Sequence, residues 1–162
     1  MNIFTNIENS TINCIMSLDL VFKLSNNLAM IGWLLLLIVP NWKWTSKLVI
    51  GTVVTILALL YIGFIFQAMN PEDMSSFGSL DGILQLFTNK AAVLAGWLHY
   101  LAFDLMVGVF IVNDGAKNHV NRFILIPCLL LTFMLGPTGL LLYLIIRWVK
   151  TKQYFVELNT VN

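Results

Sequence analysis

The chain has 162 residues, of which 59% are hydrophobic and 10% are charged, and its formal net charge is +1. Soluble domains contain about 45–50% apolar and about 25% charged residues, so this composition excludes a water-soluble domain of this size. The near-neutral charge gives no indication of a nucleic-acid partner. The sequence therefore predicts one integral membrane domain surrounded by membrane lipids.

Four apolar segments, separated by polar loops, are each about long enough to cross the roughly 30 Å hydrocarbon core of a bilayer. They cover residues 18–39, 48–69, 91–112 and 123–148. A membrane span must satisfy its own backbone hydrogen bonds, so we expect an all-α fold, a four-transmembrane-helix bundle. The membrane domain is predicted at 18–148, after a flexible N-terminus (1–17) and before a C-terminal tail (149–162).

The N-terminal stretch has neither the basic region and apolar core of a secretory signal nor the Arg-rich composition of a transit peptide. We therefore expect it to be retained, and we expect the protein to lie in a bacterial inner membrane. Four spans would place both termini and the loop of residues 70–89 on one side. Lys and Arg residues are divided almost evenly between the two sides, with a slight excess that favours cytoplasmic termini.

Two local signals add detail to this bundle. Ser79 is a candidate N-cap for a short amphipathic helix at residues 80–88, between the second and third segments, that would lie on the membrane surface. Its simplest role is that of a rigid connector, and the alternative is a lid over a membrane site. Gly136-Pro137 lies in the middle of the fourth segment, where proline removes a backbone donor and predicts a kink.

The third segment contains Asp104, the only charged residue deep inside an apolar segment. A carboxylate near the bilayer centre costs at least about 2.5 kcal/mol, which makes Asp104 a candidate functional residue. Tyr100 precedes it by one helical turn and can approach it, whereas His99 lies about 140° away around the helix and needs another partner. The candidate partners of Asp104 on other segments are Asn26, Asn27 and Gly136-Pro137.

A metal site would need three or four ligands. The available side chains in this region are His99, Asp104 and Asp114, so we predict neither a metal site nor a cofactor.

The stretch GWLHYLAFDL (residues 96–105), followed by Val107-Gly108 and by Asp114-Gly115, resembles the abscisic-acid-deficient-four-like family, which is related to neoxanthin synthesis. Parts of residues 126–147, including Gly136-Pro137 and Arg147, are similar to the C-terminal half of the same family. Parts of residues 28–40 resemble its first helix. The resemblance covers about residues 18–148 and implies a four-helix membrane protein.

Plant relatives are linked to the formation of neoxanthin from violaxanthin in plastids, an isomerisation that opens an epoxide and forms an allene. The resemblance therefore implies a lipophilic small-molecule partner, a carotenoid or another isoprenoid, and an isomerase activity based on acid–base chemistry. The candidate catalytic residues are Asp104, His99 and Tyr100, and the candidate substrate-binding residues are Trp97, Phe103, Asn26 and Asn27. The alternative is a non-enzymatic membrane subunit that binds a lipid or pigment or supports a partner enzyme. In that case Asp104 and His99 only hold the bundle together.

Overall fold

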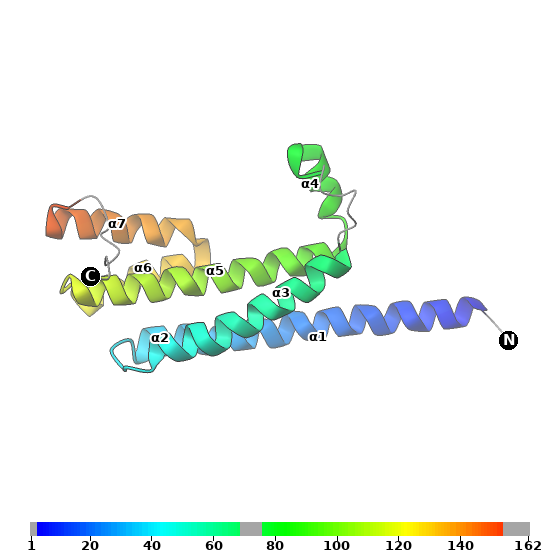
Figure 1. The fold of residues 1–162 in the computed structure, drawn as a ribbon, viewed down its shortest axis with the longest axis horizontal. Coiled ribbons are helices and arrows are strands. Elements are labelled where there is room, and N and C mark those ends of the chain that lie inside the picture. Colours follow the sequence, from blue (N-terminus) through cyan, green and yellow to red (C-terminus); the bar gives the residue numbers. More distant parts are fainter. Residues whose placement is uncertain (1–2, 69–75, 154–162) are drawn as a thin grey trace, which may run out of the picture. The chain divides into compact units, whose positions relative to one another are not determined.

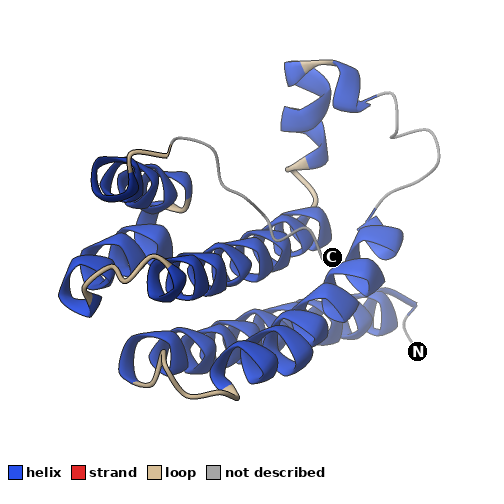
Figure 2. Ribbon diagram, turned by 60° about the vertical axis from the view of Figure 1, so that its left-hand side comes forward, coloured by secondary structure: helices blue, strands red, loops and turns tan. Residues whose placement is uncertain are grey.

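The computed structural model describes residues 3–68 and 76–153, with side chains from residue 18 onward. All regular elements in this part of the chain are helices, which confirms the prediction of an all-α fold (Figures 1 and 2). In chain order they are α1 (Ile3–Ile38), α2 (Thr45–Leu48), the π-helix η1 (Val49–Val54), α3 (Thr55–Ala68), α4 (Leu80–Leu86), α5 (Lys90–Lys117), α6 (Arg122–Leu135) and α7 (Pro137–Thr151).

Three helical stretches of the described chain are long and apolar enough to cross a membrane: Leu18–Ile38, Thr45–Ala68 and Lys90–Lys117. They coincide with the first three predicted segments, because a run of apolar residues long enough to span a bilayer satisfies its backbone best as a continuous helix. The third stretch is longer than its apolar run, since α5 continues through Asp114 to Lys117.

The fourth predicted span is a helical hairpin. Gly136 separates α6 from α7 and has φ +45° and ψ −98°, a conformation that glycine adopts far more easily than other residues. α7 then runs back alongside α6 (Figure 2). Near the end of α7, Nζ of Lys150 donates a hydrogen bond to the carbonyl of His119, which lies in the turn between α5 and α6. At about 1.5 Å per residue, one kinked helix would hold these two residues far apart.

The prediction of a single kinked fourth span is therefore wrong, because Gly136 reverses the chain instead of bending it. The side of the membrane on which residues 70–89 and the end of the fourth segment lie stays a prediction. α7 ends beside the turn between α5 and α6.

The two helices of the hairpin pack closely at Gly139. A Cβ atom at this position would overlap the backbone nitrogen and hydroxyl of Thr132 and the carbonyl oxygen of Cys128. The Thr132 hydroxyl itself donates to that carbonyl at 2.8 Å. Small residues permit such close approach between helices in membranes, so Gly139 allows α7 to lie directly on α6.

The described helices belong to two compact units. Unit 1 comprises residues 1–31 and 53–102, and unit 2 comprises residues 32–52 and 103–162. In unit 1 the core includes Ala29, Leu57 and Leu98, and in unit 2 it includes Leu36 and Leu105. Helices α1 and α5 contribute to both units, so the candidate residues on α5 are divided between them.

The predicted short helix is confirmed as α4. Its N-cap is Ser79, whose hydroxyl accepts a hydrogen bond from the backbone N–H of Gly82 at 3.1 Å. Leu80, Leu84 and Phe87 are exposed, as the amphipathic pattern predicts. The position of α4 on the membrane surface stays a prediction.

Candidate functional site

Asp104 lies on α5 within unit 2, and only 8% of its surface is exposed. Its carboxyl group lies against Gly136, where a Cβ atom would be 2.9 Å from Oδ1 and 3.4 Å from Oδ2. Gly136 ends α6 and is the N-cap of α7. The structure therefore brings Asp104 to the Gly136-Pro137 turn, one of its predicted partners.

The start of α7 creates a favourable electrostatic environment for this carboxyl group. The first backbone N–H groups of a helix have no partner within the helix, and the helix dipole places partial positive charge there. Broken helices in membrane proteins use such ends to stabilise negative charge away from water. The reversal at Gly136 thus provides a physical reason for a carboxyl group at this depth of an apolar segment.

An apolar groove lies between α5 and α7 in unit 2. Its volume is about 410 Å³. Phe103, which is 54% exposed, lies at this groove, and Asp104 follows it in the chain without lining the groove. The lining residues are Phe103, Met106, Val107, Phe110, Leu140 and Leu144. The groove is therefore a candidate binding surface for an apolar chain on α5, the helix that carries Asp104.

Trp97 is the centre of an aromatic cluster in unit 1. Its indole N–H donates to Oδ1 of Asn26 at 2.8 Å. Its ring centroid lies 5.3 Å from that of Tyr100 and 5.7 Å from that of Phe22. Oδ1 of Asn26 is therefore occupied by Trp97, and Asn27 is exposed. These ring distances are typical of packed aromatic pairs.

His99 is exposed on α5, and its ring centroid lies 5.5 Å from that of Tyr61 on α3. His99 and Tyr100 belong to unit 1, whereas Phe103 and Asp104 belong to unit 2. The candidate catalytic residues are thus divided between the two units.

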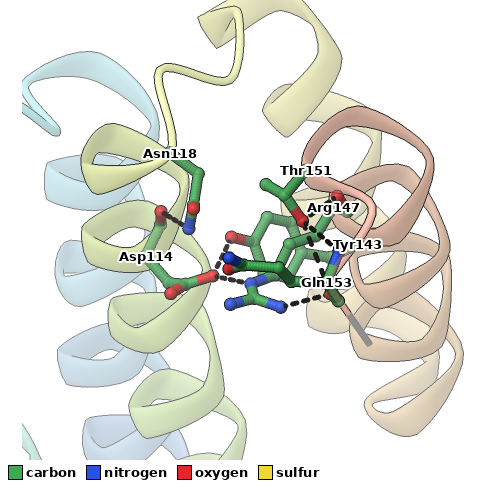
Figure 3. Close-up of polar contacts among 6 residues, drawn as sticks. All are labelled: Asp114, Asn118, Tyr143, Arg147, Thr151 and Gln153. Carbon is green, nitrogen blue, oxygen red and sulfur yellow. Dashed lines mark hydrogen bonds and ion pairs between the residues drawn. The ribbon is translucent and has the colours of Figure 1, made fainter. Parts of the chain in front are cut away.

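A second carboxyl group, Asp114, forms a buried polar cluster that the sequence reasoning missed (Figure 3). Oδ2 of Asp114 accepts hydrogen bonds from the Tyr143 hydroxyl at 2.5 Å and from Nε of Arg147 at 2.9 Å. The side chains of Arg147 and Asp114 are only 5% and 9% exposed. Nδ2 of Asn118 also donates to the Asp114 carbonyl at 2.8 Å.

The other groups of this cluster are occupied as well. Nη1 of Arg147 donates to the Gln153 carbonyl at 3.0 Å, and the Thr151 hydroxyl donates to the Arg147 carbonyl at 2.9 Å. The cluster joins the end of α7 to the end of α5. A sequence signal did exist, because Tyr143 and Arg147 are four residues apart and so share one helix face. Asp114, however, precedes a glycine, a pattern typical of a helix end, and Arg147 lies close to Lys150 and Lys152, a pattern typical of a basic tail.

Comparison with known proteins gives one match. A family model described as ABA DEFICIENT 4-like matches residues 20–143. No curated protein and no solved structure matches the chain. The matched region includes both Asp104 and Gly136, so the pair that forms the candidate site lies inside it.

Proposed function

This chain belongs to the ABA DEFICIENT 4-like family, and on that premise we propose that it is a membrane-embedded isomerase of a carotenoid or another lipophilic isoprenoid. The observation that carries the proposal is the position of Asp104. Its carboxyl group is buried in an apolar segment and lies at the start of α7, where the backbone reverses at Gly136. Buried ionisable residues in membrane segments are rare and typically functional.

Isomerisation of an epoxide to an allenic alcohol requires two proton transfers and no external reagent. Asp104 in its neutral form donates a proton to the epoxide oxygen as the C–O bond breaks. The resulting carboxylate then removes a proton from carbon as the new double bond forms, which restores the neutral acid. The positive end of α7 would stabilise the carboxylate between the two steps.

The apolar groove between α5 and α7 favours the proposal that the substrate is long and lipophilic. Phe103 and Phe110 supply aromatic surface on α5, and Leu140 and Leu144 supply the opposite wall on α7. In this proposal Phe103 contacts the apolar chain of the substrate. His99 and Tyr100 remain candidate catalytic residues, and Trp97, Asn26 and Asn27 remain candidate substrate-binding residues.

Pigment analysis of cells that express the protein together with several xanthophylls tests the proposal. We expect a new isomer with the parent protein that disappears with Asp104→Asn, while folded protein remains in the membrane. Asp81→Asn is the matched control, because it removes an exposed carboxylate from the first turn of α4 and should leave the product unchanged. Full activity of Asp104→Asn would show that Asp104 is not the acid–base group.

One observation favours the alternative, a non-enzymatic subunit. Trp97 and His99 make ring contacts within unit 1, and the indole N–H of Trp97 is already bonded to Asn26. Such contacts are sufficient for helix packing. Unchanged pigment with every xanthophyll, together with co-purification of a pigment or enzyme, would support the subunit.

The hairpin also leads us to propose an orientation in the membrane. Of the nine Lys and Arg residues, only Lys23 and Lys90 belong to unit 1. Unit 2 holds Lys43, Lys47, Lys117, Arg122, Arg147, Lys150 and Lys152. Because basic residues concentrate on the cytoplasmic side, we propose that residues 39–44, residues 118–121 and the end of α7 face the cytoplasm. The hairpin then enters the membrane and returns to the same side.

Labelling of single cysteines in a cysteine-free background tests this orientation. Asn41→Cys and Lys152→Cys should react from the cytoplasmic side, and Gly78→Cys should react from the opposite side. A four-span protein would give a different result, with Lys152→Cys and Gly78→Cys reacting from one side.

A further inference from the structure

A pocket in unit 2, distinct from the Asp104 site, lies where residues 39–44 meet the turn between α5 and α6. Its volume is about 240 Å³. Val112, Val120 and Leu125 supply apolar surface, and the three are buried. The exposed residues at the pocket include Asn41, Ala116, His119 and Arg122. The pocket therefore combines an apolar floor with a polar, cationic rim.

Arg122 is held in place at this rim by the end of α1. Its Nη2 donates to the carbonyl oxygens of Leu37 at 2.8 Å and Ile38 at 2.7 Å. A guanidinium group has five N–H donors in a planar fork. Within the described residues Nε and Nη1 of Arg122 donate to no acceptor, so three donors of a fixed guanidinium remain available.

The exposed surface of the described part of unit 2 is strongly basic. Lys43, Lys47, Lys117, Lys150 and Lys152 are exposed in the same unit, in addition to Arg122. Among the described carboxylates of unit 2, Asp104 is buried and Asp114 is paired with Arg147. No exposed carboxylate of the described part of this unit therefore neutralises the surface.

Two tryptophans indicate that this surface meets lipid headgroups. Trp42 and Trp44 are about half exposed, and Nζ of Lys47 lies 5.1 Å from the ring centroid of Trp44. Exposed Trp beside Lys at the end of a membrane helix is typical of the boundary between lipid and water.

We infer that this pocket binds the headgroup of an anionic phospholipid. The fixed guanidinium of Arg122 would donate charge-assisted hydrogen bonds to the phosphate through its free N–H groups, and such bonds are stronger than those between neutral groups. The glycerol and the first acyl carbons would lie on Val112, Val120 and Leu125. The surrounding lysines would favour an anionic lipid over a zwitterionic one. The inference does not depend on the proposed isomerase activity.

Native mass spectrometry of the full chain in detergent tests this site, with dioleoylphosphatidylglycerol and dioleoylphosphatidylcholine added at equal concentrations. We expect the anionic lipid to be retained several-fold more than the zwitterionic lipid. Arg122→Lys keeps the charge but loses the guanidinium donors that α1 holds in place, and Ala116→Phe fills the pocket without changing any charge. Each substitution should reduce the ratio towards one, whereas the control Lys90→Gln, in unit 1, should leave it unchanged.

Three results would overturn the inference. Equal retention of the two lipids by the parent protein would show no headgroup selectivity. Full selectivity in Ala116→Phe would show that diffuse surface charge suffices and that the pocket is not used. Displacement of the lipid by inorganic phosphate at similar concentration would show that the apolar floor contributes nothing. If Arg122→Lys fails to fold because the contacts with α1 are lost, Ala116→Phe still decides the question.

Discussion

Two aspartates on α5 are buried to nearly the same degree but have very different surroundings. Asp104 is 8% exposed as a residue, and the side chain of Asp114 is 9% exposed. Asp114 has an arginine and a phenol as partners, and they join α5 to the end of α7. Asp104 lies at the other end of α7, against a glycine in a strained turn.

This difference distinguishes Asp114, a carboxyl group with a structural role, from Asp104, a candidate catalytic group. The charge of Asp114 is neutralised by Arg147, and its Oδ2 accepts two hydrogen bonds, so it is suited to holding helices together. Asp104 has the start of a helix beside it, and the helix dipole there favours negative charge. A carboxyl group in that environment is suited to exchanging protons. The Asp114 cluster fixes one end of α7 relative to α5, and the contact between Asp104 and Gly136 fixes the other end.

The largest loss of stability should follow from Arg147→Ala. It leaves the buried carboxylate of Asp114 without its cation, and breaking a buried pair in this way costs about 3–5 kcal/mol. Chemical denaturation in detergent, followed by circular dichroism, measures the loss. Asp114→Asn combined with Arg147→Leu should be less destabilising than Arg147→Ala alone, because both charges are then removed. A loss below about 1 kcal/mol for Arg147→Ala would show that the pair contributes no more than an exposed one.

Tyr143→Phe should have the next largest effect. It removes only the hydroxyl that donates to Oδ2 of Asp114, and a hydrogen bond to a charged group contributes about 1.5–3 kcal/mol. The loss should largely vanish when the substitution is made in an Asp114→Asn background. Equal losses in the two backgrounds would show that Tyr143 acts through packing, for example against Phe110.

Gly136→Ala tests the other end of α7. A residue other than glycine in such a rare backbone conformation costs about 1–3 kcal/mol, and the new methyl group would displace the Asp104 carboxyl group. We therefore expect a lower denaturation midpoint together with loss of any isomerase activity. Gly63→Ala is the matched control, since a Cβ at Gly63 meets no neighbouring atom, and it should not destabilise the protein. Unchanged stability and activity of Gly136→Ala would refute the proposed contact.

Asp104→Asn should have the smallest effect on stability, about 1 kcal/mol or less, because the amide keeps the shape of the carboxyl group and most of its hydrogen bonding. Activity should nevertheless be lost, since an amide does not exchange protons at accessible pH. Asp104→Leu should cost about 1–3 kcal/mol, because it removes the polar group from its partners. Thermal melts in detergent, run beside the pigment assay, compare the two variants. If stability and activity fall in parallel, Asp104 is structural like Asp114, and the contrast between them disappears.

Local features of the sequence were sufficient to predict the secondary structure and to identify part of the candidate site. The three helical stretches that are long enough to cross a membrane follow from the length of each apolar run, which depends only on neighbouring residues. The cap at Ser79 is equally local, because its hydroxyl bonds to Gly82 three residues later. Asp104 was recognised for a related reason, since a charge in an apolar run is visible without any knowledge of its partner.

Only the tertiary structure decided how the C-terminal part folds and which residues meet. Proline after glycine is compatible with a kink and with a reversal, and the packing of α7 on α6 at Gly139 selects the reversal. Asp114 and Arg147 are 33 residues apart and meet only because the hairpin returns α7 to the end of α5. The reversal also brings Lys150, near the end of α7, to the turn between α5 and α6, where it donates to the carbonyl of His119. Contacts between distant residues depend on the path of the chain, which hydropathy and local propensity do not specify.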